Sequence, residues 1–245
     1  MNENGFFDHI KKEGIYLEVP GTPKTAIFKK RLNRFVAEVM IGGVLHLSHV
    51  PSSGRMSELL YPGAEVYVLP MSSEKRKTPF KLIAAKHKGQ LVSVDSLLPN
   101  RLIDKALKKK AMGLFKDYGR HQRECTYKNS RFDFCFLENE IKCLIEVKSV
   151  TLVEDGAALF PDAPSSRAKK HLKELMHAKR NGFDAHVVFV IQRSDALFFR
   201  PNDSRDPGFG ALLRQSSKAG VALSAYDCRV DRKAVKLNGS LPIVL

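Results

Sequence analysis

The sequence predicts a two-domain protein, in which a small β-barrel is followed by an α/β domain with a mixed sheet. Short apolar runs separated by turn residues fill the first part of the chain. Helical periodicity first appears close to residue 100, and helices then alternate with strands. Because the pattern changes near residue 91, we expect the barrel over residues 1–90 and the α/β domain over residues 91–245.

Turn signals mark the strands of the first domain. Within residues 34–50, "RFVAEVMIGGVLHLSHV", two β-branched runs flank Gly42-Gly43, and paired glycines accept the positive φ angles of a hairpin turn. Residues 61–70, "YPGAEVYVLP", contain a second turn at Pro62-Gly63 followed by a strand-like run. This spacing fits a small β-barrel. An oligonucleotide-binding (OB) barrel is one such fold, and the spacing alone does not separate it from other small barrels.

The second domain begins with a predicted helix in "LPNRLIDKALKKKAM". Leu102, Ile103, Ala106 and Leu107 form an apolar stripe at helical spacing, and Asn100 is the expected N-cap. The elements expected after this helix are three strands at 123–128, 131–138 and 142–150, a helix at 165–182, a strand at 185–192, a helix at 206–220 and a strand at 221–230.

Two details of these later elements bear on the site. The strands at 131–138 and 142–150 should form a hairpin that turns near Asn139-Glu140. The helix at 165–182 should bury Leu172, Leu175 and Met176 and stop at Asn181-Gly182. The run "AHVVFVIQ" is apolar throughout, as expected of a strand buried on both faces.

The charge balance points to a polyanionic partner. Lys and Arg together number 41 against 26 Asp and Glu, which gives a formal net charge of +15. Nucleic acid is the leading candidate for such a partner, and an anionic membrane surface is the second. Membrane insertion is not expected, because no apolar run approaches the ~20 residues of a membrane span. The N-terminus lacks the apolar core of a signal peptide, so we expect a cytoplasmic protein.

The four cysteines, Cys125, Cys135, Cys143 and Cys228, form no CxxC pair. Three of them lie in strand-like runs, where small buried thiols are ordinary. This spacing gives little support for a zinc site. In a reducing compartment we also expect no disulfide.

Three charges lie among the strand residues of "RFDFCFLENEIKCLIEVKSVT", residues 131–151. Glu146 and Lys148 are two residues apart and so share one face of their strand, and the predicted hairpin brings Asp133 to nearly the same height in the sheet. Two converging carboxylates repel each other unless a cation lies between them, and a hard cation such as Mg²⁺ or Mn²⁺ is the simplest candidate. With a lysine alongside, this set is suited to phosphodiester hydrolysis.

A plainer interpretation of the same residues stays open. Glu146 and Lys148 could be an ordinary ion pair on an edge strand, worth under about 1 kcal/mol, with Asp133 unrelated to them. The flanking residues "CLI" and "V" favour a central strand instead.

Several segments resemble the sugar fermentation stimulation protein A family over nearly the whole chain. They are "SRFDFCFL", "IEVKSVTLVEDGAALFPDAPSSRAKKHLKELM", "LLPNRLIDKAL" and "HVPSSGRMSELLYPGAEVYV", the last with an S-G-x-M core at Ser53, Gly54 and Met56. The resemblance implies an N-terminal OB barrel and a C-terminal nuclease-like domain of the PD-(D/E)xK superfamily. It also implies DNA binding linked to the regulation of sugar utilisation genes.

Carried over to this sequence, the nuclease motif falls on Asp133, Glu146 and Lys148, with Glu124 as a further metal ligand. The residues expected to contact the nucleic acid are Arg31, Arg34 and Arg55 in the barrel and Arg167, Lys169, Lys170 and Lys173 on the basic helix.

Three further residues could take part in binding or in supporting the site. His171 could reach a phosphate, although a helical histidine is more often solvated or capping. Phe35 could stack on a base, although an aromatic residue in a strand is more often part of the core. Gln192 could support the site from the end of the buried strand.

Two functions compete on this basis. One is a Mg²⁺-dependent or Mn²⁺-dependent nuclease, and the other is a non-catalytic nucleic-acid-binding regulator on a nuclease-like fold. The intact pair of carboxylates favours the first, because two acids facing a polyanion would weaken binding alone. Sugar binding has little support, since the chain contains no tryptophan.

Overall fold

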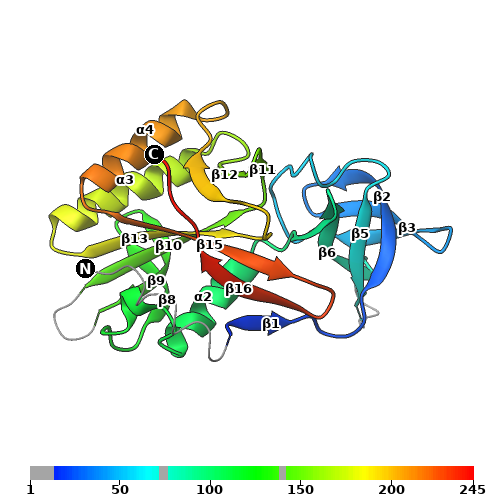
Figure 1. The fold of residues 1–245 in the computed structure, drawn as a ribbon, viewed down its shortest axis with the longest axis horizontal. Coiled ribbons are helices and arrows are strands. Elements are labelled where there is room, and N and C mark those ends of the chain that lie inside the picture. Colours follow the sequence, from blue (N-terminus) through cyan, green and yellow to red (C-terminus); the bar gives the residue numbers. More distant parts are fainter. Residues whose placement is uncertain (1–13, 72–76, 138–141) are drawn as a thin grey trace.

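The computed structural model describes residues 14–71, 77–137 and 142–245, and within them the chain forms the two predicted parts. Figure 1 shows a β-barrel on the right and a larger α/β body on the left. The hairpin turn predicted near Asn139-Glu140 lies outside the described residues.

The barrel consists of strands β2 to β7. Their bounds are β2 Lys24–Asn33, β3 Val36–Ile41, β4 Val44–His49, β5 Glu65–Pro70, β6 Phe80–His87 and β7 Gln90–Ser93. The antiparallel order is β4-β3-β2-β5-β6-β7, and a pairing of β4 with β6 closes five of these strands into a barrel. The predicted hairpin at Gly42-Gly43 is confirmed, with both glycines at positive φ (55° and 84°) between β3 and β4.

The α/β body is built on a mixed sheet in the order β1-β16-β15-β13-β10-β9-β8. Its strands are β1 Tyr16–Glu18, β8 Gln122–Tyr127, β9 Ser130–Phe136, β10 Cys143–Val150, β13 Asp184–Ile191, β15 Ala222–Val230 and β16 Ala234–Ser240. Strand β1 precedes the barrel in the sequence but pairs with β16 here. Strand β10 has β9 on one side and β13 on the other, so the edge-strand interpretation of Glu146 and Lys148 is wrong.

Helices cover both faces of this sheet (Figure 1). Helix α2 (Leu98–Lys108) and the short η2 (Gly113–Phe115) pack on one face, and α3 (Ser166–Arg180) and α4 (Pro207–Lys218) pack on the other. The predicted apolar stripe of α2 is buried, but the helix starts at Leu98, so the predicted N-cap role of Asn100 is wrong. Across the described ranges, no helix combines the length and the apolar character that a membrane crossing requires.

A small three-stranded sheet was not predicted. It pairs β11 (Val153–Glu154) with β12 (Ala157–Phe160) and β12 with β14 (Phe198–Pro201). These strands are too short and too widely separated in sequence for local periodicity to reveal their pairing.

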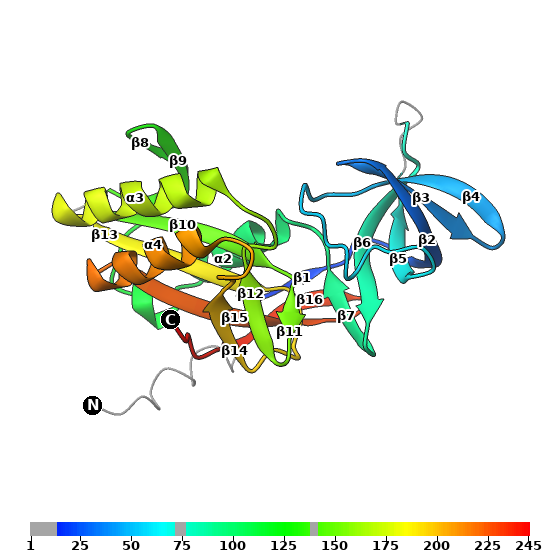
Figure 2. The ribbon, with the colours of Figure 1, turned by 90° about the horizontal axis from the view of Figure 1, so that it is seen from above.

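The two parts are joined by direct hydrogen bonds. The Ser93 amide at the end of β7 donates to the Gln192 carbonyl (3.1 Å), and the Ser96 amide donates to the Pro51 carbonyl (3.0 Å). Arg232 donates to the Tyr67 hydroxyl at 3.0 Å. Strand β7 also lies beside β15 of the α/β body (Figure 2).

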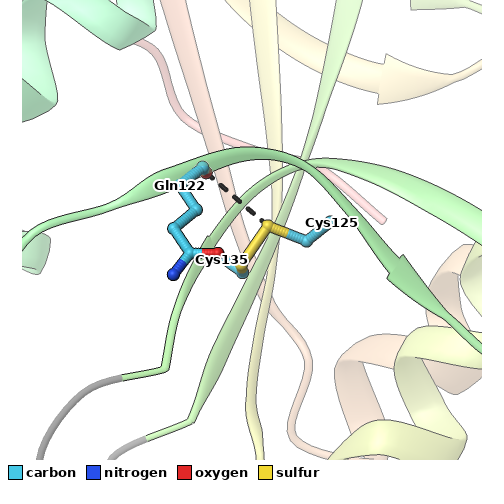
Figure 3. Close-up of a disulfide and its surroundings, with 3 residues drawn as sticks. All are labelled: Gln122, Cys125 and Cys135. Atoms are coloured by element: carbon cyan, nitrogen blue, oxygen red, sulfur yellow. Dashed lines mark hydrogen bonds between the residues drawn. A yellow bond between two sulfur atoms is a disulfide. The ribbon is translucent and has the colours of Figure 1, made fainter.

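One expectation about the cysteines is wrong. Cys125 on β8 and Cys135 on β9 form a disulfide (Figure 3), with their Cα atoms 6.0 Å apart. The two residues are not ladder partners, since Cys125 faces Phe132 in the register. The ladder is interrupted between them at Glu124, whose φ of 57° is left-handed, and this local backbone geometry could not be predicted from spacing. Cys143 and Cys228 are free, buried thiols, as expected.

His186 is an uncharged histidine in the core. It lies on β13 with its ring edge against Phe115, and its Nδ1 is buried without a hydrogen-bond partner among the described residues. Burial lowers the pKa of His186 to about 4, against a weaker opposing effect of Asp184. As the pH falls, His186 therefore binds a proton near pH 6.5 in the unfolded chain but only near pH 4 in the folded chain.

We predict that His186 makes the fold acid-sensitive. Its contribution to stability is fully present above pH 6.5 and is lost as the pH falls from there toward 4, by up to about 3 kcal/mol. Urea unfolding at neutral pH and at mildly acidic pH should show a larger loss for the wild type than for His186→Phe. Equal losses in both proteins would contradict the assignment.

Candidate functional site

Asp133 and Glu146 lie on the neighbouring strands β9 and β10. The ladder between β9 and β10 ends where Ile145 pairs with Phe134, so Asp133 and Glu146 lie just beyond its last pair. Glu146 points toward α3, where it contacts His171, whereas Asp133 is held by Asn100 of α2 and by the Val147 amide of β10. Both acids line one pocket of about 370 Å³ together with Lys148. The predicted convergence of the three charges is therefore present.

Glu146 is a buried carboxylate with two cationic or polar partners. Its Oε1 lies 2.6 Å from Lys148 Nζ and 2.6 Å from His171 Nδ1, and its side chain is only 5% exposed. Burial acts to raise the pKa of Glu146, but Lys148 and His171 outweigh burial and hold it below its usual value. Its Oε2 is buried and has no hydrogen-bond partner among the described residues. That oxygen therefore has unused capacity to accept a hydrogen bond.

Asp133 has a different electrostatic setting. Its Oδ1 accepts a hydrogen bond from Asn100 Nδ2 (2.6 Å), and its Oδ2 accepts one from the Val147 amide (2.7 Å). Burial and the nearby charge of Glu146 raise the pKa of Asp133 to about 6. Two acids with pKa values pushed apart by one environment are typical of a functional site.

His171 and Asn100 are site residues that the sequence did not reveal as such. His171 was expected to be solvated, capping or near a phosphate, yet it is buried on α3 and contacts Glu146. Asn100 was expected to cap a helix, yet it lies inside the first turn of α2 and positions Asp133. The available signal was their polarity at helix positions next to apolar residues, which does not specify a partner.

Glu124 does not join this group. The flanking β8–β9 pairs put it opposite Asp133, so its place in the register suits a ligand. However, its φ of 57° breaks the ladder there, and its carboxylate is exposed, 3.4 Å from Arg131. It does not line the pocket. Within residues 14–71, 77–137 and 142–245, no three His, Cys, Asp or Glu side chains gather to hold a metal ion.

The pocket lies between the two domains. The barrel contributes the 52–56 loop, and the other wall includes Asp162, Arg167 and Gln192. Gln192 donates to Ser149 Oγ at 2.8 Å, which fits the supporting role considered for it. The space beside Gly54 is tight, because a Cβ there would lie 3.1 Å from Asp162 Oδ2 and that side chain would have to shift. Asp162 is an acid at the pocket that the sequence did not single out.

Arg31 holds the barrel loop together. Its guanidinium donates to the carbonyls of Arg34 and Ser52 (2.6 Å each) and to those of Gly54 and Arg55. Burial lowers the pKa of Arg31, and Asp162 opposes that effect. Four carbonyl partners leave this side chain little capacity to bind a phosphate as well.

The other predicted cations fall into two groups. Lys169 pairs with Asp206 at 2.9 Å, and Lys170 donates to the Asn129 carbonyl. Lys173 is exposed on α3. In contrast, Arg34, Arg55 and Arg167 line a second cavity of about 730 Å³ at the domain interface, together with Arg31. The structure thus brings together four of the seven predicted binding residues.

We predict that Arg31 contributes mainly to stability. Arg31→Lys should lower the free energy of unfolding by about 2 kcal/mol, because one ammonium cannot reach carbonyls on both sides of the loop. The matched variant Arg34→Lys, in the turn that follows β2, should change the free energy of unfolding by less than about 0.5 kcal/mol. Chemical unfolding measures both. Similar effects of the two variants would contradict this structural role.

These features define a class of protein: an OB-type barrel joined to an α/β domain, with an acidic and cationic pocket between them. Two family models match the chain. Residues 30–94 match the SfsA N-terminal OB domain, and residues 97–234 match the sugar fermentation stimulation protein RE domain. The chain belongs to the sugar fermentation stimulation protein family, and the predicted OB barrel and α/β domain are confirmed.

Curated relatives and a solved structure agree over nearly the full length. A sugar fermentation stimulation protein homolog of Desulforamulus reducens is 47% identical over 220 residues, covering 90% of this chain and 92% of the relative. A homolog of Acetivibrio thermocellus is 43% identical over 232 residues, covering 94% and 100%. The structure of Pyrococcus furiosus SfsA in complex with Ca²⁺ superposes with a TM-score of 0.86 at 27% identity, covering 95% of this chain and 99% of that chain.

Proposed function

We propose that this protein binds DNA and hydrolyses phosphodiester bonds with the help of a divalent cation, on a PD-(D/E)xK-like domain. The observation that carries the proposal is that Asp133 and Glu146 line one pocket together with the cations Lys148 and Arg167. Two carboxylates next to a polyanion serve no purpose in simple binding but are the usual ligands of a catalytic cation.

The residues present fit such a cation. Glu146 Oε2 is a buried oxygen without a hydrogen-bond partner, and each Asp133 oxygen accepts one described hydrogen bond where it can accept two. Asp133 and Glu146 would therefore hold Mg²⁺ or Mn²⁺. The relative from Pyrococcus furiosus was solved in complex with Ca²⁺, which also takes oxygen ligands.

The side chains then have separate tasks in hydrolysis, in which water adds to phosphorus and the bond to the leaving oxygen breaks. A bound divalent cation supplies Lewis-acid polarisation of a phosphoryl oxygen. Lys148, held at 2.6 Å from Glu146, offers its ammonium to the charge that develops on the phosphate. Asn100 and His171 keep the two carboxylates oriented through their hydrogen bonds.

A second candidate is a non-catalytic DNA-binding regulator, in keeping with the family's link to sugar fermentation. The contacts of Glu146 favour this second candidate, because Lys148 and His171 already stabilise the charge of that carboxylate without a metal ion. In this case the fold would serve affinity and regulation of sugar utilisation genes without cleavage.

Replacing one carboxylate separates the two candidates. If the site is catalytic, Glu146→Gln should abolish divalent-ion-dependent cleavage of DNA, because one of two anionic ligands is lost. DNA binding should remain, since a negative charge near the phosphates has been removed. Gel assays of single-stranded and duplex DNA with Mg²⁺ or Mn²⁺, and binding measured without metal, test this.

Two further variants sharpen the comparison. Lys148→Ala should keep the cation and slow turnover, because the lysine acts on the phosphate and is not a ligand. Glu124→Gln is the matched control, since Glu124 occupies the same row of the sheet but points away from the pocket. Cleavage that survives in Glu146→Gln, or a wild type inactive with every divalent ion on DNA, would leave the regulator as the function.

DNA binding should depend steeply on salt. If Arg34, Arg55 and Arg167 each displace one counterion from a single strand, the logarithm of the binding constant should fall with the logarithm of the salt concentration with a slope of about −2. The affinity should then fall on the order of tenfold between about 50 mM and 200 mM salt. Fluorescence anisotropy across a salt series measures it. An affinity that barely changes with salt would contradict phosphate contacts as the basis of binding.

A further inference from the structure

The second cavity adjoins the carboxylate pocket. Both are lined by Ser53 and Gly54 of the barrel loop and by Asp162, Ser165 and Arg167 of the α/β domain. An extended ligand, such as a nucleic-acid strand, that enters one cavity can therefore continue into the other. The second cavity is the part of this path that lies farther from Asp133 and Glu146, neither of which lines it.

Three arginines of this cavity are free to bind an anion. The guanidinium groups of Arg34, Arg55 and Arg167 make no hydrogen bond or ion pair with any residue that the structure describes. The two terminal nitrogens of Arg31 donate to backbone carbonyls, and Asp162 is the acid among the lining residues. The cavity therefore has an excess of positive charge contributed by both domains, which suits a phosphate backbone.

Phe35 lies beside these arginines in an unexpected setting. The expectation that it belongs to the core is wrong, because it follows Arg34 in the turn between β2 and β3 and is 50% exposed. The turn is held in place by a hydrogen bond from the Phe35 amide to Asn33 Oδ1 and by one from the Val50 amide to the Phe35 carbonyl. An exposed aromatic ring on a turn whose backbone is held in place, next to a cationic side chain, is a platform on which a base can stack.

The size of the path limits what can enter. The two cavities measure about 370 Å³ and 730 Å³, within the range of about 300 to 1,000 Å³ typical of small-ligand sites. Each can take one or a few nucleotides, but not both strands of a duplex. Stacking on Phe35 also requires a base that is not already stacked and paired.

We propose that Arg34, Arg55 and Arg167 bind the phosphates of a single-stranded DNA segment, that Phe35 stacks on one of its bases, and that this segment leads to Asp133 and Glu146. This inference rests on the proposed function and specifies its substrate as unpaired DNA, such as an overhang or a frayed end.

Binding without metal tests the aromatic contact separately from cleavage. Fluorescence anisotropy in EDTA would compare one labelled oligonucleotide as a single strand and as a blunt duplex with its complement. Phe35→Ala should weaken single-strand binding roughly tenfold, with little effect on the duplex. Phe35→Trp should retain it. The control Val44→Ala, at the other end of the β3–β4 hairpin and similarly exposed, should have no effect.

Two arginines of one helix give an independent measurement. Arg167 and Arg180 lie at opposite ends of α3, and only Arg167 lines the cavity. Arg167→Gln should lower the affinity for the single strand and reduce its salt slope by about 0.7, whereas Arg180→Gln should leave both unchanged.

The outcomes distinguish this inference from the function on which it rests. Equal affinity for the single strand and the duplex, together with wild-type behaviour of Phe35→Ala and Arg167→Gln, would overturn the inference while leaving a DNA-binding protein. Failure to bind either oligonucleotide would overturn the proposed function as well, and so would binding only to vesicles of anionic phospholipid. A tenfold loss in Phe35→Ala that Phe35→Trp restores would support unpaired DNA as the substrate.

Discussion

Burial of the Glu146 carboxylate is the constraint on which the arrangement of the site depends. Glu146 lies on a central strand and is almost fully enclosed, and an unpaired carboxylate there would cost several kcal/mol. Lys148 and His171 offset that cost, and His171 can do so only if α3 packs at one position on the sheet. The same packing directs the N-terminal end of α3, with Arg167, toward the pocket.

Further contacts hold α3 in that position. Ser165 caps the helix by accepting a hydrogen bond from the Ala168 amide, and Asp206 accepts one from the Ser165 amide while also capping α4. Lys169 completes this set through its ion pair with Asp206. Lys169 was predicted to bind nucleic acid, but its contacts show that it joins the starts of the two helices. The residue that remains free at this end of α3 is Arg167.

The barrel takes part in the same site through one loop. Arg31 donates to the carbonyls of Ser52, Gly54 and Arg55, and this loop forms a wall shared by the two cavities. Hydrogen bonds between the domains, such as that from Ser93 to the Gln192 carbonyl, hold the loop against the α/β domain. An OB-type barrel therefore contributes cationic side chains and an exposed aromatic ring beside acids that belong to another domain.

Local sequence patterns determined the elements and the central row of charges. Glycine pairs, apolar stripes and strand alternation act over a few residues, and they were sufficient to predict the barrel hairpin, the helices α2 and α3, and the convergence of Asp133, Glu146 and Lys148, which line one pocket. Only the tertiary structure decided that His171 and Asn100 support those acids, that Arg31 is structural, and that Phe35 is exposed. It also decided that Glu124 points away and that Cys125 bonds to Cys135. These outcomes depend on the packing of segments distant in sequence or on one left-handed backbone angle, neither of which a periodic pattern of residue types encodes.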